Sequence, residues 1–217
     1  MRTARVCGII LAMEAEIVFK RKFYAKLVDW KAEGNGSTAA LVEGARRIGK
    51  STICREFAKN EYKSHILIDF ALAKKNVKDL FFNHLDDLDT FFMMLQTIFG
   101  VTLYERESAI IFDEVQRFPR AREAIKYLVA DGRYDFIETG SLISIKENVK
   151  DIVVPSEERQ LKMFPLDFEE FCWAVGKKQL ADYIKECFSK RESLERGLHD
   201  EAMLIFKQYM LVGGMPQ

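Results

Sequence analysis

The sequence predicts an α/β fold in which a parallel five-stranded sheet is flanked by helices. Three observations support this prediction. Residues 44–51 match the phosphate-binding pattern G-x-x-x-x-G-K-[ST], between a short apolar run and a helical segment. A second apolar run, 109–112, ends in two acidic residues. Apolar runs alternate with helical patterns along the chain, an order typical of parallel strands joined by helices.

Five apolar runs are long enough to form buried strands, and most of the segments between them have helical patterns. The predicted strands are 38–42, 64–70, 108–113, 134–139 and 160–164. The predicted helices are 16–32, 51–59, 119–131, 167–174, 179–189 and 195–212, and residues 71–104 have a helical composition interrupted by an acidic turn at 86–89. Pro119 suits the first turn of its helix, and Asp167 suits a helix N-cap.

Each part of the phosphate-binding pattern, or P-loop, has an expected chemical role. Its glycines permit a tight turn, so that backbone N–H groups point at phosphate oxygens. Lys50 adds a positive charge for the β- and γ-phosphates, and the Ser51 hydroxyl is suited to bind Mg²⁺. The helix that follows adds the partial positive charge of its N-terminus. The residues expected to contact the nucleotide are Gly44, Ala45, Arg46, Arg47, Ile48, Gly49, Lys50, Ser51 and Thr52.

Two acids at the end of the predicted strand 108–113 are candidates for metal binding and catalysis. Ligands of open α/β sheets bind at the carboxyl ends of strands, so Asp113 and Glu114 should lie beside the P-loop. We expect Asp113 to hold Mg²⁺ with Ser51, and Glu114 to act as general base toward water. A solvated strand end or a helix cap is the alternative for an isolated Asp-Glu pair.

A hydroxyl at the end of the predicted strand 134–139 is suited to sense a γ-phosphate. Thr139 is the first candidate for this role, and Ser141 is the second. The alternative is that Thr139-Gly140-Ser141 is an ordinary turn, because such residues are common in turns.

These segments resemble the predicted AAA-type P-loop ATPases of bacteria and archaea, whose N-terminal ATPase domain is followed by a C-terminal domain of uncertain function. The resemblance runs from about residue 19 to the end and rests on the blocks 43–51, 112–117, 139–141, 164–171 and 213–216. It implies a P-loop core of the additional-strand type that binds ATP and Mg²⁺. It also implies that an arginine from a neighbouring subunit or domain completes the site.

Arg159 stands where related sequences carry such an arginine, so the resemblance makes it a candidate catalytic residue. The alternative is a surface charge at a strand edge. The sequence is compatible with a homo-oligomer, or a partner domain, that supplies the arginine.

The sequence predicts a chain of three parts. Residues 1–15 are expected to form a disordered leader, residues 16–176 the P-loop ATPase core, and residues 177–217 a helical extension leading to a C-terminal domain that is missing from this sequence. Two arginines and a short apolar run within residues 1–12 faintly resemble a signal peptide, but acidic residues follow at once. Translation from Met13 is an alternative origin for this leader.

Composition narrows the class of partner. Lysine plus arginine equal aspartate plus glutamate at 33 each, so the formal charge of zero argues against an extensive nucleic-acid surface. The four cysteines form no C-x-x-C pattern, which suits a reducing cytoplasm. No apolar run reaches the length of a transmembrane helix, so we expect no membrane contact.

The sequence therefore predicts hydrolysis of Mg-ATP to ADP and phosphate, coupled to a conformational change. A nucleotide-dependent switch or scaffold with little intrinsic turnover is the first alternative, and the missing C-terminal domain is a route by which it could associate with DNA. A small-molecule kinase is the second, although it needs an acceptor pocket and usually an arginine-rich lid. A DNA-associated motor or loader is the third. The sequence contains no N-K-x-D segment of the kind that reads guanine, and this favours ATP over GTP.

Overall fold

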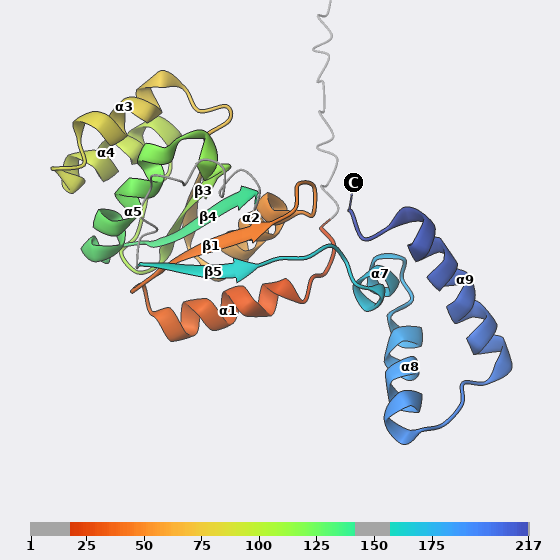
Figure 1. The fold of residues 1–217 in the computed structure, drawn as a ribbon. Helices are drawn as coiled ribbons and strands as arrows, with labels where there is room; N and C mark the ends of the chain where they lie inside the picture. The colour runs from red at the N-terminus through yellow and green to blue at the C-terminus, as the bar shows by residue number, and fades with distance from the viewer. Residues whose placement is uncertain (1–17, 142–156, 217) are drawn as a thin grey trace, which may run out of the picture.

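The computed structural model describes residues 18–141 and 157–216, and the predicted leader at 1–15 lies outside the described residues. An α/β core and a separate group of three helices are visible in Figure 1. The strands are β1 (Ala39–Gly44), β2 (Ser64–Asp69), β3 (Ser108–Asp113), β4 (Asp135–Ser141) and β5 (Glu158–Lys162). The helices are α1 (Phe23–Gly34), α2 (Lys50–Glu61), α3 (Lys75–Asn83), α4 (Leu88–Phe99), the 3₁₀ helix η1 (Val115–Arg117), α5 (Pro119–Asp131), α7 (Phe168–Ala174), α8 (Lys178–Lys190) and α9 (Arg196–Val212).

The five strands form one parallel sheet in the order β2-β3-β4-β1-β5. This arrangement confirms the predicted parallel five-stranded sheet. Strand β4 lies between β3 and β1, so one strand separates the acids after β3 from the loop after β1. Because all strands run the same way, their carboxyl ends meet at one edge, where ligands bind in open α/β sheets.

Helices cover both faces of the sheet, which explains the nearly continuous apolar character of its strands. Successive side chains point to opposite faces. Ile110 and Phe112 therefore pack on the face covered by α3, α4 and α5. Ala109 and Ile111 pack on the face covered by α1 and α2. Burial on both faces makes the carboxyl edge of this sheet a rigid support for a site.

The helix predicted at 16–32 is shorter than expected. Helix α1 begins at Phe23, because the backbone N–H of Lys22 donates to the carboxylate of Glu170 at 2.7 Å. The segment 71–104 holds two helices, and Asp87 caps the second by accepting a hydrogen bond from the Thr90 N–H at 3.1 Å.

Strands β1, β2, β4 and β5 differ from their predicted bounds by one or two residues, and pairing with β1 explains two of these differences. Strand β4 extends to Ser141 because its last residues pair with the end of β1, where Ser141 lies opposite Gly44. Strand β5 begins at Glu158 rather than at residue 160, because Glu158 pairs with Ala39 at the start of β1.

Helices α7, α8 and α9, here called the helical unit, have an apolar cluster of their own. Its buried members are Phe171, Cys172, Leu180, Ala181, Ala202 and Ile205. The predicted end of the core, residue 176, lies just after α7. In the structure, α7 packs with the two later helices, and the chain crosses from the sheet to the helical unit in the segment 163–167.

Within 18–141 and 157–216, none of the helices combines the length and the apolar content that a transmembrane span requires.

Candidate nucleotide-binding site

The loop between β1 and α2 is shaped by two glycines and one buried anchor. A Cβ on Gly44 would lie 2.4 Å from the carbonyl oxygen of Met163 and 2.5 Å from Cδ1 of Ile48, so only glycine fits there. Gly49 has a φ of +87°, a conformation that glycine adopts without steric cost. Ile48 is fully buried, whereas residues 45–47 are exposed. The loop is therefore tied to the core at one residue while its tip remains accessible.

Lys50 opens helix α2 and turns back over the loop. Its side chain is buried, and its ammonium donates to the carbonyl of Ala45 at 2.8 Å and to that of Gly44 at 3.3 Å. Burial lowers the pKa of Lys50, and the negative charges of Glu114 and Asp113 oppose that shift. The ammonium thus lies within the field of both predicted acids.

The predicted metal pair meets at the carboxyl edge of the sheet. The Ser51 hydroxyl donates a hydrogen bond of 2.6 Å to Oδ1 of Asp113. The hydroxyl of Thr139 donates to the same carboxylate oxygen. The Thr139 hydroxyl in turn accepts a hydrogen bond from the backbone N–H of Glu114 at 3.2 Å. Three segments of the chain therefore converge on one carboxylate.

The donor chemistry at this point suits Mg²⁺. A hydroxyl and a carboxylate are hard oxygen ligands, and Mg²⁺ usually takes one or two protein carboxylates together with water and phosphate oxygens. Across the described residues, no group of three or more His, Cys, Asp or Glu side chains could hold a metal ion. The pair Ser51 and Asp113 fits an ion that also binds water and phosphate oxygens.

Glu114 has an unusual backbone conformation. Its φ of +54° is in the left-handed region, which is sparsely populated by residues with side chains and is often found at functional sites. Gln116, which is buried, donates from its amide to Oε2 of Glu114. No role is predicted for Gln116 from the sequence, although it lies in the block 112–117 on which the family resemblance rests.

Strand register separates the two candidates for the phosphate sensor. Thr139 lies opposite Val42, whereas Ser141 lies opposite Gly44, where the P-loop begins. Thr139 is fully buried and its hydroxyl is already shared between the two acidic residues. Thr139 therefore contacts both acidic residues, and Ser141 lies level with the start of the loop.

Arg159 lies away from the site of its own chain. It pairs with Ala40, near the start of β1, and the four residues from there to Gly44 span roughly 13 Å. Its guanidinium forms an ion pair of 2.6 Å with Glu33, and about two fifths of the side chain is exposed. Within one chain, this geometry corresponds to the alternative of a surface charge at a strand edge.

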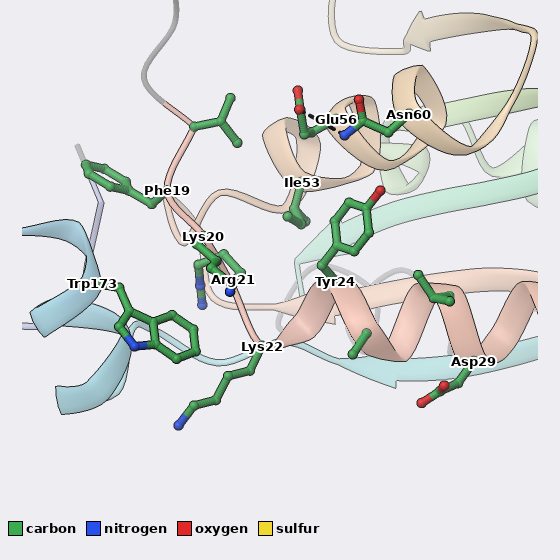
Figure 2. A pocket seen from close by; sticks show the side chains of 13 residues that line it. Phe19, Lys20, Arg21, Lys22, Tyr24, Asp29, Ile53, Glu56, Asn60 and Trp173 are labelled. Carbon is green, nitrogen blue, oxygen red and sulfur yellow. Dashed lines mark hydrogen bonds between the residues drawn. The ribbon is translucent and has the colours of Figure 1, made fainter. Parts of the chain in front are cut away.

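A hollow of about 620 Å³ lies between the segment 18–22, helices α1 and α2, and Trp173 of α7. Figure 2 shows Ile53 of α2 and Tyr24 of α1 on one side of the hollow, and Trp173 on the other side. Ile53 follows Lys50 by three residues, so it lies one helical turn along α2. The hollow therefore begins close to the P-loop.

The block 213–216 returns to the P-loop after α9. The carbonyl of Gly214 accepts a hydrogen bond of 2.7 Å from the N–H of Leu166. A Cβ on Gly214 would lie 2.3 Å from the carbonyl oxygen of Leu166, so the contact requires glycine. A Cβ on Gly49 would lie 3.8 Å from Cγ of Pro216. The end of the described chain therefore packs beside the loop.

The parallel sheet, the loop at its carboxyl edge and the adjacent serine and aspartate define a domain of the P-loop NTPase class. The family described as "AAA domain" matches residues 36–172, which is more than half of the chain. The chain therefore belongs to this family, and its domain is of the nucleotide-binding, AAA-type ATPase kind. A search of curated proteins found no match for the chain.

Proposed function

We propose that the domain binds ATP with Mg²⁺, hydrolyses it to ADP and phosphate, and uses the reaction to drive a conformational change. The hydrogen bond of 2.6 Å between Ser51 and Asp113, beside the buried ammonium of Lys50, is the observation that carries this proposal. It joins the phosphate loop to an acid of another strand, as a shared metal and triphosphate require.

The binding roles follow from the loop. Backbone N–H groups of residues 44–52 hold the phosphates, and Lys50 exchanges its bonds with loop carbonyls for phosphate oxygens. Ser51 and Asp113 hold the ion. Bound Mg²⁺ would supply positive charge that polarises the terminal phosphate.

The hydrolytic role falls to Glu114. Its carboxylate accepts a proton from the attacking water as the water oxygen bonds to the γ-phosphorus. The bond between that phosphorus and the bridging oxygen breaks, and ADP leaves with the electron pair. The amide of Gln116 restrains the Glu114 carboxylate, and Thr139 restrains its backbone.

We propose that the nucleoside part of ATP occupies the end of the hollow nearest Ile53. That end adjoins α2 just beyond Lys50, and the lining of the hollow is largely apolar, which suits a heterocyclic base. The ring of Trp173 and the side chain of Phe19 offer aromatic surface across the hollow from Ile53.

Two substitutions test the proposal. Lys50→Ala should abolish ATP binding or nearly so, because it removes the buried charge. Glu114→Gln should leave binding intact and stop turnover, because the amide cannot accept the proton. Glu123→Gln, an exposed acid on α5, is the matched control and should change neither measurement. Hydrolysis by the Glu114 variant at the parent rate would refute the assigned base.

The position of Arg159 favours a second candidate, a nucleotide-dependent switch with little turnover in a single chain. Arg159 forms an ion pair with Glu33 near the amino ends of the strands, whereas the P-loop lies at their carboxyl ends. An arginine that completes the site would therefore have to come from a neighbouring subunit or domain. Specific activity measured against protein concentration separates the candidates. A rise with concentration, lost in Arg159→Ala, supports a homo-oligomer completed by Arg159, whereas a constant rate supports a complete site in one chain.

We also propose that the domain works in the cytoplasm. ATP is the proposed substrate, and Cys54, Cys172 and Cys187 are free and buried thiols, which suits a reducing compartment. Fractionation of cells that express a tagged chain tests this proposal.

A further inference from the structure

Arg21 is a buried arginine for which no role is predicted from the sequence. It precedes α1, and only 5% of its side chain is exposed, which is rare for arginine. Its guanidinium donates to the carbonyl of Ile48 at 2.7 Å, to the carbonyl of Phe164 at 2.6 Å and to the Glu170 carboxylate at 3.3 Å. One side chain thus joins the P-loop, the segment after β5 and helix α7.

The contact with the Ile48 carbonyl restrains the Ile48–Gly49 peptide, which belongs to the loop proposed to bind phosphate. In a trans peptide, the carbonyl and the following N–H point in opposite directions. When Arg21 holds the Ile48 carbonyl, it therefore also holds the Gly49 N–H on the side away from Arg21. A Cβ on Gly49 would lie 3.9 Å from Nη1 of Arg21, so the guanidinium packs directly against this peptide.

The contact with Glu170 extends the same restraint to the helical unit. Glu170 is buried and also accepts hydrogen bonds from the N–H of Lys22 at 2.7 Å and from the N–H of Asp167 at 3.1 Å. Asp167 caps α7 by accepting from the N–H of Glu170 at 2.8 Å. The acid is therefore fixed to the first turn of α7, and the guanidinium links that turn to the P-loop.

We propose that Arg21 is a positioning residue for nucleotide binding: it orients the Ile48–Gly49 peptide for phosphate and couples that orientation to α7 through Glu170. The inference rests on the proposed function, since it assigns the loop to phosphate. Lysine cannot replace Arg21 fully, because one ammonium cannot present a planar fork of donors to three separated acceptors.

The first test needs no nucleotide. Amide hydrogen exchange of the whole chain is compared between the parent, Arg21→Met and the control Arg133→Met. Arg133 is matched because its guanidinium also makes three hydrogen bonds, to Asp131 and Asp89, near the amino end of β4. Arg21→Met should speed exchange both in residues 44–50 and in α7, and Arg133→Met should do neither. Unchanged protection of the loop in Arg21→Met would overturn the proposal.

The second test measures the Kd for Mg-ADP in the same proteins. Arg21→Met should raise the Kd roughly tenfold, the size expected when one charge-assisted hydrogen bond no longer orients the site. Arg21→Lys should recover part of that loss, and Arg133→Met should bind as the parent does. An Arg21→Met protein that binds like the parent would refute the positioning role. If the parent itself binds no nucleotide, the proposed function fails, and the exchange experiment still decides whether Arg21 orders the loop.

Discussion

The hydroxyl of Ser51 lies 2.6 Å from a carboxylate oxygen of Asp113, although 62 positions separate the two residues in the chain. Ser51 belongs to the first turn of α2, and Asp113 ends β3. Strand β4 lies between β3 and the strand that leads into the P-loop, and its Thr139 bonds to the same carboxylate. The two residues proposed to bind Mg²⁺ meet at this point.

Removing the charge of Asp113 should weaken the binding of Mg²⁺ at the nucleotide site. We expect Asp113→Asn to raise the Mg²⁺ concentration for half-maximal ATP binding by at least about tenfold. The amide oxygen can still accept the hydrogen bonds of Ser51 and Thr139, so Tm should change little. Titration of Mg²⁺ at fixed ATP measures the effect, with Asp182→Asn on the exposed side of α8 as control. An unaltered Mg²⁺ requirement would argue against Asp113 as a ligand.

The affinity for ATP should fall as the pH rises into the alkaline range. Burial lowers the pKa of Lys50, so its ammonium loses its proton at a lower pH than an exposed lysine, whose pKa is near 10.5. The neutral amine no longer attracts the triphosphate, whereas bound phosphate favours the charged form. Binding should therefore take up protons at alkaline pH. Calorimetry in buffers of different ionisation enthalpy measures that uptake.

The Lys50→Ala variant is the control for this pH dependence. Its residual affinity for ATP should be weak, and it should show neither the fall in affinity nor the proton uptake that Lys50 causes at alkaline pH. If the parent keeps its full ATP affinity throughout the alkaline range, Lys50 does not supply the charge that binds phosphate.

Replacing the buried acid Glu138 should stabilise the protein at neutral and alkaline pH. Burial raises the pKa of Glu138, and the nearby carboxylate of Glu158 raises it further, against the opposing charge of Arg122. The folded protein thus retains a proton that the unfolded chain loses above its ordinary pKa near 4.5, so stability falls as the pH rises toward the higher, folded pKa. Glu138→Gln removes this loss because its amide does not ionise.

Thermal unfolding between pH 5 and pH 8 measures the effect of Glu138→Gln. The Tm of the variant should exceed that of the parent at pH 8, by about 2–4 °C for each kcal/mol relieved, and the difference should shrink toward pH 5. Glu123→Gln on the surface should show no such trend. A variant less stable than the parent at pH 8 would mean that the ionised form of Glu138 stabilises the fold.

Two hydroxyls at the end of β4 should have different roles. Thr139→Val removes the donor to Asp113 and the acceptor for the Glu114 N–H, so we expect kcat to fall by roughly 10–100-fold with little change in the Kd for ATP. Thr139→Ser should restore turnover. Ser141 lies level with the start of the P-loop, so Ser141→Ala should instead weaken the binding of ATP more than the binding of ADP. Parent-like turnover by Thr139→Val would contradict the supporting role of this hydroxyl.

The sheet and its loop could be predicted from the sequence because their determinants are local. Strand β3 and helix α5 have the predicted bounds, 108–113 and 119–131, since an apolar run and a proline at the first helical turn mark them. The start of α1 could not be predicted. The helical periodicity continues toward the N-terminus past Phe23, through the segment that contains Arg21. In the structure, Arg21 bonds to Glu170, which lies 149 positions away, and such a distant contact cannot be read from local periodicity.

The sequence by itself determined that the chain has a phosphate loop between a strand and a helix, and two acids after a buried strand, because each feature occupies a few consecutive residues. Only the tertiary structure decided which groups meet there. In the structure, the hydroxyl of Thr139 bonds to Asp113 and to the N–H of Glu114. Arg159 lies near the amino ends of the strands, and Arg21 bonds to the P-loop at Ile48. Strand register and long-range packing decide such contacts, and neither can be inferred from the spacing of residues along one segment.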